Sequence, residues 1–227
     1  MPVEVRDRDI QTSAVLNEFL SYETTLATKN RDYRQWHKGR EKFAVWTVGI
    51  CNAQVQSRFD AARAWMDPFL FSPYCRQPHV TLLVCGFLTH SPRFSDDYSS
   101  QSFRHHLQDL WQARIQPFEI CIGGMNSFAA APFLEVFDTQ GGLAQIRRIL
   151  TNSFCEDRTR AYVPHLTIGL YAGAFNTRDV AEKMAAFQTK DRISCLVDKI
   201  TLSTYSSFEI AGPLSAEQEI HLKTAGR

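Results

Sequence analysis

The feature that most constrains this chain is a short motif that occurs twice. The segments PHVTLLV, at residues 78–84, and PHLTIGL, at residues 164–170, each place a histidine after a proline and a threonine two residues later. Apolar residues fill most of both segments, as is typical of buried β-strands. Because side chains alternate between the two faces of a strand, the histidine and threonine of each motif point the same way. Each motif therefore presents one imidazole and one hydroxyl to the same space.

The segments around the two motifs follow the same order of a strand, a helix and a motif strand, and a further helix and strand come after each motif. The distance along the chain from Phe43 to His79 is 36 residues, and that from Phe133 to His165 is 32. This order predicts an internal duplication, packed as an α+β or α/β architecture of two pseudo-symmetric lobes. The two copies cover residues 43–50, 55–66 and 79–87, and residues 131–137, 141–154 and 165–171.

The rest of the chain is divided by composition. Apolar residues spaced as on a helix occur between about residues 12 and 28, followed by a polar, basic connector. We therefore predict an amino-terminal helical extension over residues 1–41, a two-lobed domain over 42–212 and a carboxy-terminal tail over 213–227.

The composition excludes several classes of protein. Lys and Arg number 25 against 24 Asp and Glu, so the net charge of +1 gives no general attraction to nucleic acid, and any contact with it must be local. The first residues are charged and no apolar run is long enough to span a bilayer, so we expect a cytoplasmic monomer without a membrane partner. The 6 cysteines include no CxxC pair, which argues against a zinc cage or a disulfide framework.

The paired motifs suit acid–base chemistry on a phosphate. One imidazole can remove a proton from the attacking oxygen while the other protonates the leaving oxygen, near neutral pH and without a metal. The hydroxyls can donate hydrogen bonds to the oxygens on which charge grows. A single HxT is more often an ordinary strand histidine, but two copies at equivalent places in a repeat favour a functional site.

With these motifs the chain resembles the two-histidine (2H) phosphoesterases, whose signature is two HxT or HxS motifs in duplicated lobes. The resemblance covers roughly residues 42–207 and includes the context RAYVPHLTI and the hairpin GGMNSF before FLEVF. Within that superfamily the chain is similar to bacterial RNA 2′,3′-cyclic phosphodiesterases, also called 2′-5′ RNA ligases. The resemblance implies an α+β fold of two lobes, with two antiparallel-rich sheets around a central cleft and helices outside.

The resemblance also implies an enzyme without cofactor or metal, a phosphoric diester hydrolase that opens 2′,3′-cyclic phosphates of RNA ends or nucleotides. The four catalytic places of the family would be taken by His79, Thr81, His165 and Thr167, with either histidine as the acid. Two alternatives use the same cleft: hydrolysis of 2′,5′-phosphodiesters or of a cyclic nucleotide, and a non-catalytic module that binds RNA or a nucleotide.

Four further residues are candidates for substrate binding. Phe128, in the hairpin, and the tyrosines Tyr74 and Tyr205 could each stack on a base. A role in the core or the hairpin is the alternative for these rings. Arg160 could add positive charge near a phosphate, and the alternative for it is a solvated place on the surface.

Overall fold

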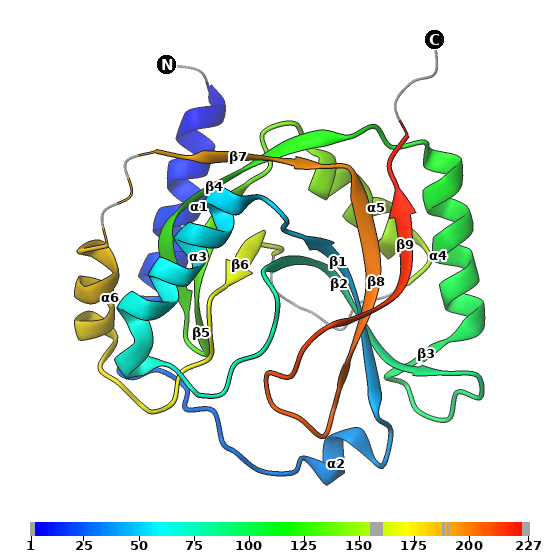
Figure 1. Cartoon of the computed structure of the whole chain (residues 1–227), viewed down its shortest axis with the longest axis horizontal. Helices are drawn as coiled ribbons and strands as arrows, with labels where there is room; N and C mark the ends of the chain where they lie inside the picture. The colour runs from blue at the N-terminus through cyan, green and yellow to red at the C-terminus, as the bar shows by residue number, and fades with distance from the viewer. Residues whose placement is uncertain (1–2, 155–160, 188, 190, 224–227) are drawn as a thin grey trace.

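The computed structural model describes residues 3–154, 161–187, 189 and 191–223. It shows one strongly curled sheet with helices packed outside it (Figure 1). No helix within these ranges is long and apolar enough to cross a membrane. The mixed architecture of helices and antiparallel strands confirms the predicted fold class.

The sheet has nine strands in the order β7-β4-β5-β6-β2-β1-β8-β9, with β3 beside β2. All neighbours are antiparallel except β2 and β3. The strands are β1 (Lys42–Gly49), β2 (His79–Thr89), β3 (Asp97–Ser99), β4 (Phe118–Phe128), β5 (Ala131–Phe137), β6 (His165–Thr167), β7 (Ile193–Val197), β8 (Lys199–Ser206) and β9 (Ser215–His221).

The strand order reads as two equivalent halves that meet between β6 and β2. In one half β1 lies between β2 and β8, and in the other β5 lies between β6 and β4. The last strand of each duplicated unit, β4 or β8, therefore belongs to the half built on the other unit. Between β6 and β2 the only residue pair in the described ladder joins Val80 to Leu166. The two expected sheets are thus joined edge to edge.

The helices also exchange between the halves. Helix α3 follows β1 in the chain but packs by β7, and α5 follows β5 but packs on β2 beside α4. Helices α1 and α6 cover β4 on the far side of the molecule from α4 (Figure 1). The helices are α1 (Val3–Leu20), α2 (Arg34–His37), α3 (Ala53–Met66), α4 (Ser100–Ala113), α5 (Gly142–Asn152) and α6 (Thr177–Ala185).

Local sequence explains where α3 begins and which face it buries. The side chain of Asn52 accepts hydrogen bonds from the backbone of Gln54 and Val55, which satisfies amide groups that the first turn leaves free. The residues at helical spacing on the inner face are all buried, and they are Val55, Phe59, Ala62 and Met66.

A buried histidine links the helices to the strands of the first half. The Nδ1 of His106 on α4 accepts from the indole of Trp46 at 3.1 Å and lies 2.8 Å from the hydroxyl of Tyr98. Its Nε2 lies 3.0 Å from the carbonyl of Leu150 on α5, to which it donates. Burial lowers the pKa of His106 to about 4, so this link is neutral at physiological pH.

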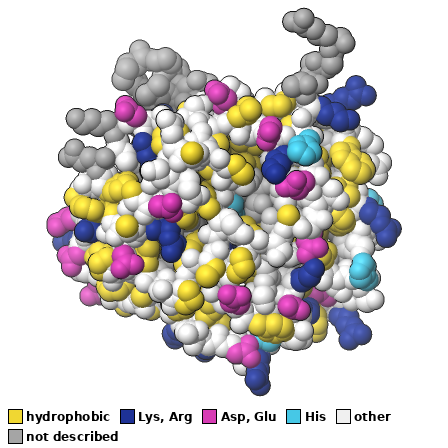
Figure 2. All heavy atoms as spheres, in the orientation of Figure 1, with side chains coloured by type: hydrophobic (Ala, Val, Ile, Leu, Met, Phe, Trp, Pro, Cys, Tyr) yellow, Lys and Arg dark blue, Asp and Glu magenta, His cyan; other side chains and the backbone are white. Residues whose placement is uncertain are grey.

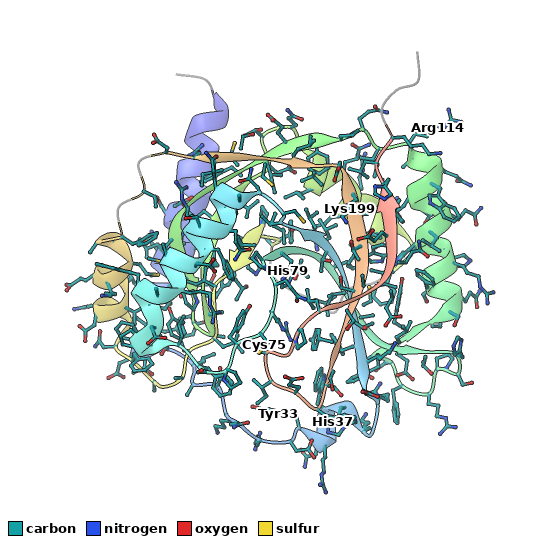
Figure 3. The ribbon with its side chains drawn as sticks, viewed as in Figure 1. Tyr33, His37, Cys75, His79, Arg114 and Lys199 are labelled. Carbon is teal, nitrogen blue, oxygen red and sulfur yellow. The ribbon has the colours of Figure 1, made fainter. Side chains whose placement is uncertain are left out.

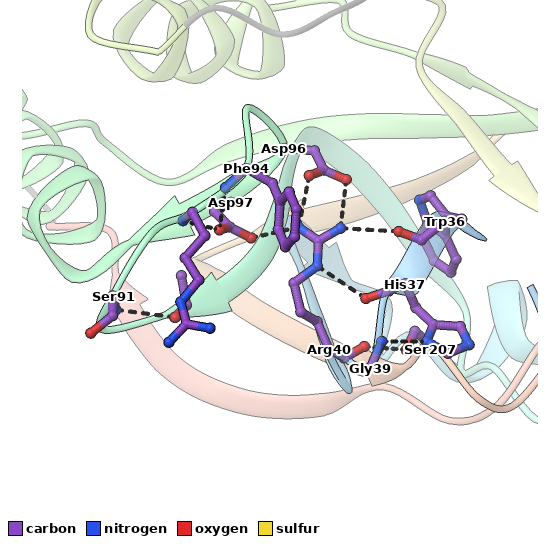
Figure 4. A network of polar contacts seen from close by, with 11 residues as sticks. Trp36, His37, Gly39, Arg40, Ser91, Phe94, Asp96, Asp97 and Ser207 are labelled. Atoms are coloured by element: carbon purple, nitrogen blue, oxygen red, sulfur yellow. Dashed lines mark hydrogen bonds and ion pairs between the residues drawn. The ribbon is translucent and has the colours of Figure 1, made fainter. Parts of the chain in front are cut away.

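The amino-terminal segment differs in detail from the prediction. Its helix runs over Val3–Leu20 and not over residues 12–28, and the connector that follows contains the short helix α2. The guanidinium of Arg40 lies 3.7 Å from the ring centroid of Phe87 and bonds to Asp96 and Asp97 at 2.7 and 2.5 Å (Figure 4). The connector is thereby fixed to the end of β2.

Residues 213–227, expected as a tail, contain β9, which pairs with β8 from Lys199 to Thr204. Of the seven residues of β9, only Ile220 is buried. A polar edge strand lacks the apolar alternation that identifies a strand in a sequence, which explains why the pattern did not predict it.

Candidate active site

The two motif strands lie side by side and bring the motif side chains onto one face of the sheet. Val80 of β2 pairs with Leu166 of β6, and both are fully buried. The residues on either side of them point to the opposite face, and in antiparallel strands each histidine then lies across from the threonine of the other motif. The side chains brought together are His79, Thr81, His165 and Thr167.

This face lines the inside of the curled sheet. In the orientation of Figure 3, His79 lies near the centre of the molecule, between the two halves. Figure 2 shows in the same orientation that the surface is hollowed near the centre. A substrate can therefore reach the motif side chains from this side of the molecule.

The two imidazoles are held by the same type of hydrogen bond to the backbone. Nδ1 of His79 lies 2.8 Å from the carbonyl oxygen of Gln77, and Nδ1 of His165 lies 2.7 Å from that of Val163. A carbonyl can only accept, so Nδ1 carries a proton in both imidazoles. The motif proline stands between the carbonyl and the histidine and fixes its own φ at about −65°. This placement accounts for the proline in each motif.

The two histidines differ in exposure and environment. His79 is only 8% exposed, whereas His165 is partly exposed. Burial lowers the pKa of His79 to about 4, the positive charges of Arg76 and His165 add to this, and the bond to Gln77 opposes it. His79 is therefore neutral at physiological pH and can accept a proton at Nε2.

Further hydroxyls extend the face beyond the first motif. Thr47 of β1 pairs with Thr81 on one side and with Thr201 of β8 on the other. Its hydroxyl lies 3.0 Å from that of Ser203 and is buried. The prediction did not include Thr47 or Ser203, although a threonine inside the buried run FAVWTVGI is a recognisable signal.

Aromatic rings lie on the side of the second motif. The ring of Phe128 meets the imidazole of His165 edge-on, with centroids 4.9 Å apart, and Phe133 lies 5.3 Å from the same imidazole. Glu135 pairs with His165 across the strands, and its carboxylate accepts from the amide of Asn126 at 3.1 Å. This side of the face therefore has two aromatic rings against its imidazole, with a carboxylate beside them.

A tyrosine and an arginine of the first unit hold the strand of the second motif. The hydroxyl of Tyr74 donates to the carbonyl of Thr167 at 3.3 Å, and Nη1 of Arg63, on α3, donates to that of Ile168 at 2.8 Å. The guanidinium of Arg63 lies 4.7 Å from the ring centroid of Tyr74. These carbonyls lie just beyond the single residue pair that joins β6 to β2.

A tyrosine and an arginine of the second unit hold the strand of the first motif in the same way. The hydroxyl of Tyr162 donates to the carbonyl of Thr81 at 3.0 Å, and Nη1 of Arg147, on α5, donates to that of Leu82. The guanidinium of Arg147 lies 3.9 Å from the ring centroid of Tyr162. We call the two pairs the crossed Tyr–Arg pairs, because each unit holds the motif strand of the other.

The structure gives the predicted substrate-binding residues different surroundings. Phe128 lies at the site, against His165. The hydroxyl of Tyr74 is used on the backbone of β6, and burial raises its pKa. The ring of Tyr205 has the guanidinium of Arg76 4.0 Å from its centroid. Arg160 lies outside the described residues.

Within the described residues no group of three or more His, Cys, Asp or Glu side chains is arranged to hold a metal ion. The groups that this face offers for chemistry include imidazoles, hydroxyls and the carboxylate of Glu135. Two imidazoles on one face can act as a proton acceptor and a proton donor on opposite sides of one reacting group.

The comparisons with known proteins agree with this geometry. The E. coli LigT structure without ligand is similar over 82% of this chain and all of its own, with a TM-score of 0.52 and 17% identity. LigT complexed with 3′-AMP gives 0.54 and 16% identity over 81% of this chain and 99% of its own. TT0787 of Thermus thermophilus gives 0.53 and 15% identity over 79% and 97%.

At these identities the structures show a shared fold only. No curated protein matches the chain by sequence. The family model described as the 2′-5′ RNA ligase superfamily matches residues 52–207, which include both motifs and more than half of the chain. The chain belongs to the 2′-5′ RNA ligase superfamily.

Proposed function

We propose that this protein hydrolyses 2′,3′-cyclic phosphates of RNA ends or nucleotides by acid–base catalysis with its two motif histidines. The observation that carries the proposal is the crossed placement of the two motifs. It puts two imidazoles and two hydroxyls on one face, with each Nδ1 bound to a backbone carbonyl two residues earlier. One phosphate can then be contacted from both sides.

The environment of His79 favours it as the base. It is buried and neutral, so its Nε2 can take a proton from a water molecule as the water oxygen attacks phosphorus. A P–O bond forms to the water oxygen, and the bond from phosphorus to one ribose oxygen breaks. His165, entering protonated, gives its proton to that oxygen, and the product is an open-ring phosphate monoester with a free hydroxyl.

The threonine hydroxyls would donate to the phosphate oxygens that bear the growing charge. Each threonine lies across from the histidine of the other motif, so both hydroxyls can reach a phosphate placed between the imidazoles. Phe128, which already packs on His165, would support the nucleoside on that side.

Two alternatives use the same face. A 2′,5′-phosphodiester or a cyclic nucleotide presents the same phosphorus chemistry with a different leaving group. A module that only binds RNA or nucleotides needs no titrating groups, and the matching Nδ1 contacts of the two histidines favour catalysis over this alternative. That LigT has been solved with 3′-AMP supports a nucleotide ligand for the fold.

The test is product analysis on 2′,3′-cyclic nucleotides, RNA ending in a cyclic phosphate, and 2′,5′ and 3′,5′ dinucleotides. We expect ring opening of the cyclic phosphates, undiminished by EDTA. Loss of activity on chelation that one metal restores would contradict the acid–base mechanism and favour attack by a metal-activated water. Binding without turnover of any compound would leave the binding module as the function.

A further inference from the structure

Arg76 is a partly buried arginine whose Nε atom has no described hydrogen-bond partner. Its guanidinium carbon lies 4.0 Å from the ring centroid of Tyr205. Its Nε is buried and has no hydrogen-bond partner among the described residues. Burying a charged donor without an acceptor is unfavourable, so a group of this kind is expected where a ligand supplies the acceptor.

Arg76 lies on the same face as the motif hydroxyls. Thr81 pairs with Thr47 and Thr47 with Thr201, so these three side chains share a face of the sheet. Tyr205 is four residues beyond Thr201 on β8 and, by alternation, shares that face. The guanidinium over its ring therefore lies inside the curled sheet. The charge of Arg76 also contributes to the lowered pKa of His79, which agrees with this closeness.

The loop that carries Arg76 is fixed on both sides of it. The backbone amide of Cys75 donates to the carbonyl of Ala211 at 2.9 Å. The side chain of Gln77 exchanges two hydrogen bonds with the backbone of Leu214, at 2.8 and 3.1 Å. Figure 3 labels Cys75, the neighbour of Arg76, in this loop below His79. Arg76 is thus held in place before any ligand arrives.

Three other arginines that lie over aromatic rings, Arg40, Arg63 and Arg147, differ from Arg76 in what their N–H groups bind. Arg40 is neutralised by two aspartates (Figure 4), and Arg63 and Arg147 donate to backbone carbonyls. Among the described residues, Nε of Arg76 donates to neither a carboxylate nor a carbonyl. Its planar fork suits two oxygens of a phosphate.

We propose that Arg76, whose guanidinium lies over the ring of Tyr205, binds phosphate oxygens of the substrate and forms a positively charged subsite beside His79. The inference deepens the proposed function, and it gives Tyr205 the role of supporting Arg76 in place of stacking on a base. The phosphate is either the reacting one or that of the neighbouring nucleotide in an RNA end, and the two sources can be separated by experiment.

The direct test is the binding of inorganic phosphate and of 3′-AMP, measured by calorimetry. We expect Arg76→Gln to weaken both by about ten-fold or more, because a charge-assisted pair is lost. Arg76→Lys should recover part of the affinity, since it keeps the charge but not the fork. The matched control is Arg104→Gln on the exposed face of α4, which should bind as the unchanged protein does. Equal affinities for Arg76→Gln and the control would overturn the proposal.

A second pair of variants tests the support by the ring. Tyr205→Phe keeps the ring and should keep more phosphate affinity than Tyr205→Leu. Tyr205→Leu removes the aromatic face and should weaken binding several-fold, in the same direction as Arg76→Gln. Weak binding in Tyr205→Phe with normal binding in Tyr205→Leu would contradict the stacked arrangement.

Kinetics then identify the phosphate. If Arg76 binds the reacting phosphate, Arg76→Gln should raise KM equally for a 2′,3′-cyclic mononucleotide and for a dinucleotide ending in a cyclic phosphate. If it binds the neighbouring phosphate, KM should rise for the dinucleotide alone. The binding assays do not depend on turnover. Loss of phosphate affinity in a protein that hydrolyses none of these compounds would therefore uphold the subsite and refute the proposed hydrolase.

Discussion

The two halves of the cleft have the same framework but different linings. In each half a carbonyl two residues before the histidine fixes the imidazole, and a tyrosine and an arginine from the other unit hold the motif strand. Around His79 the neighbours are hydroxyls and the cation of Arg76, whereas around His165 they are the rings of Phe128 and Phe133.

This difference shows which parts of the duplicated unit have remained equivalent. The contacts that orient the imidazoles and the motif strands are the same in both halves, as expected if both are needed to place one acid and one base. The difference in lining would suit the proposed nucleotide substrate, which has two unlike ends. The polar half suits a phosphate and the aromatic half suits a nucleoside, so the proposed substrate has one preferred direction in the cleft.

The largest expected effect comes from removing either of the two motif imidazoles. We expect His79→Ala and His165→Ala each to lower turnover on the order of 10²- to 10⁴-fold, with the fold retained. The acidic limb of kcat/KM should follow the free-protein pKa of His79, about 4, because His79 must be neutral to act as base. Steady-state rates across pH check both statements, and an unchanged rate in either variant removes that histidine from the mechanism.

The next effect concerns the threonines of the two halves. Thr81→Val and Thr167→Val keep the β-branched shape but remove a hydroxyl, so each should raise the barrier by roughly 2–4 kcal/mol while the melting temperature stays level or rises. The double variant should lose less than the product of the single losses, because both hydroxyls serve one phosphate. Near-normal turnover in all three proteins would leave the threonines as strand residues only.

Stability should depend on pH through His79. The unfolded chain takes up a proton near pH 6.5 and folded His79 near pH 4, so the unfolded state binds more protons between these values. The free energy of unfolding should therefore fall as pH drops from about 6.5 to 4, by up to about 3 kcal/mol from His79. The buried His106 should add a similar loss. Denaturant unfolding at several pH values measures the total.

The His79→Ala variant separates the contribution of His79 to the pH-dependent loss of stability from that of His106. Its free energy of unfolding should vary less with pH than that of the unchanged protein, while the share of His106 stays. An identical pH dependence in the two proteins would contradict the burial that lowers the pKa of His79.

The smallest effect tests the crossing of the Tyr–Arg pairs. Tyr74→Phe and Tyr162→Phe each remove one hydroxyl from a carbonyl, worth about 0.5–1.5 kcal/mol, or roughly two- to ten-fold in turnover. If the pairs position the motif strands, Tyr74→Phe should couple to Thr167→Val and Tyr162→Phe to Thr81→Val. Double-mutant cycles measure these couplings. Coupling of each tyrosine to the threonine of its own unit would contradict the crossed arrangement.

Much of the fold was predictable because the spacing of apolar residues indicates the duplicated order of strands and helices. The motif strands, their shared face and the pairing of unlike residues across it follow from alternation alone. The positions of α3 and α5 do not, because periodicity shows that a helix has an apolar face but not which half of the sheet that face covers. Strand β9 was missed since its exposed edge has little apolar pattern.

The site was predictable to the same degree. The two HxT motifs were found because spacing and chemistry repeat, and the structure brings them together. The role of Tyr74 on the backbone of β6 and that of Arg76 over Tyr205 depend on contacts between residues far apart in the chain. A single sequence does not contain such contacts, so Tyr205 was predicted to stack on a base.

The junction between β6 and β2, where the two halves of the sheet meet, has a consequence for how the proposed reaction would respond to small displacements of the imidazoles. An ordinary strand ladder fixes the spacing of its neighbours with many backbone hydrogen bonds, but here one residue pair does so, between Val80 and Leu166. The four side chains of the crossed Tyr–Arg pairs also bridge this junction, because each unit holds the motif strand of the other. Under the proposed function, substitutions among Tyr74, Arg63, Tyr162 and Arg147 would change the fit between the imidazoles and the phosphate while every proposed reacting group stays the same.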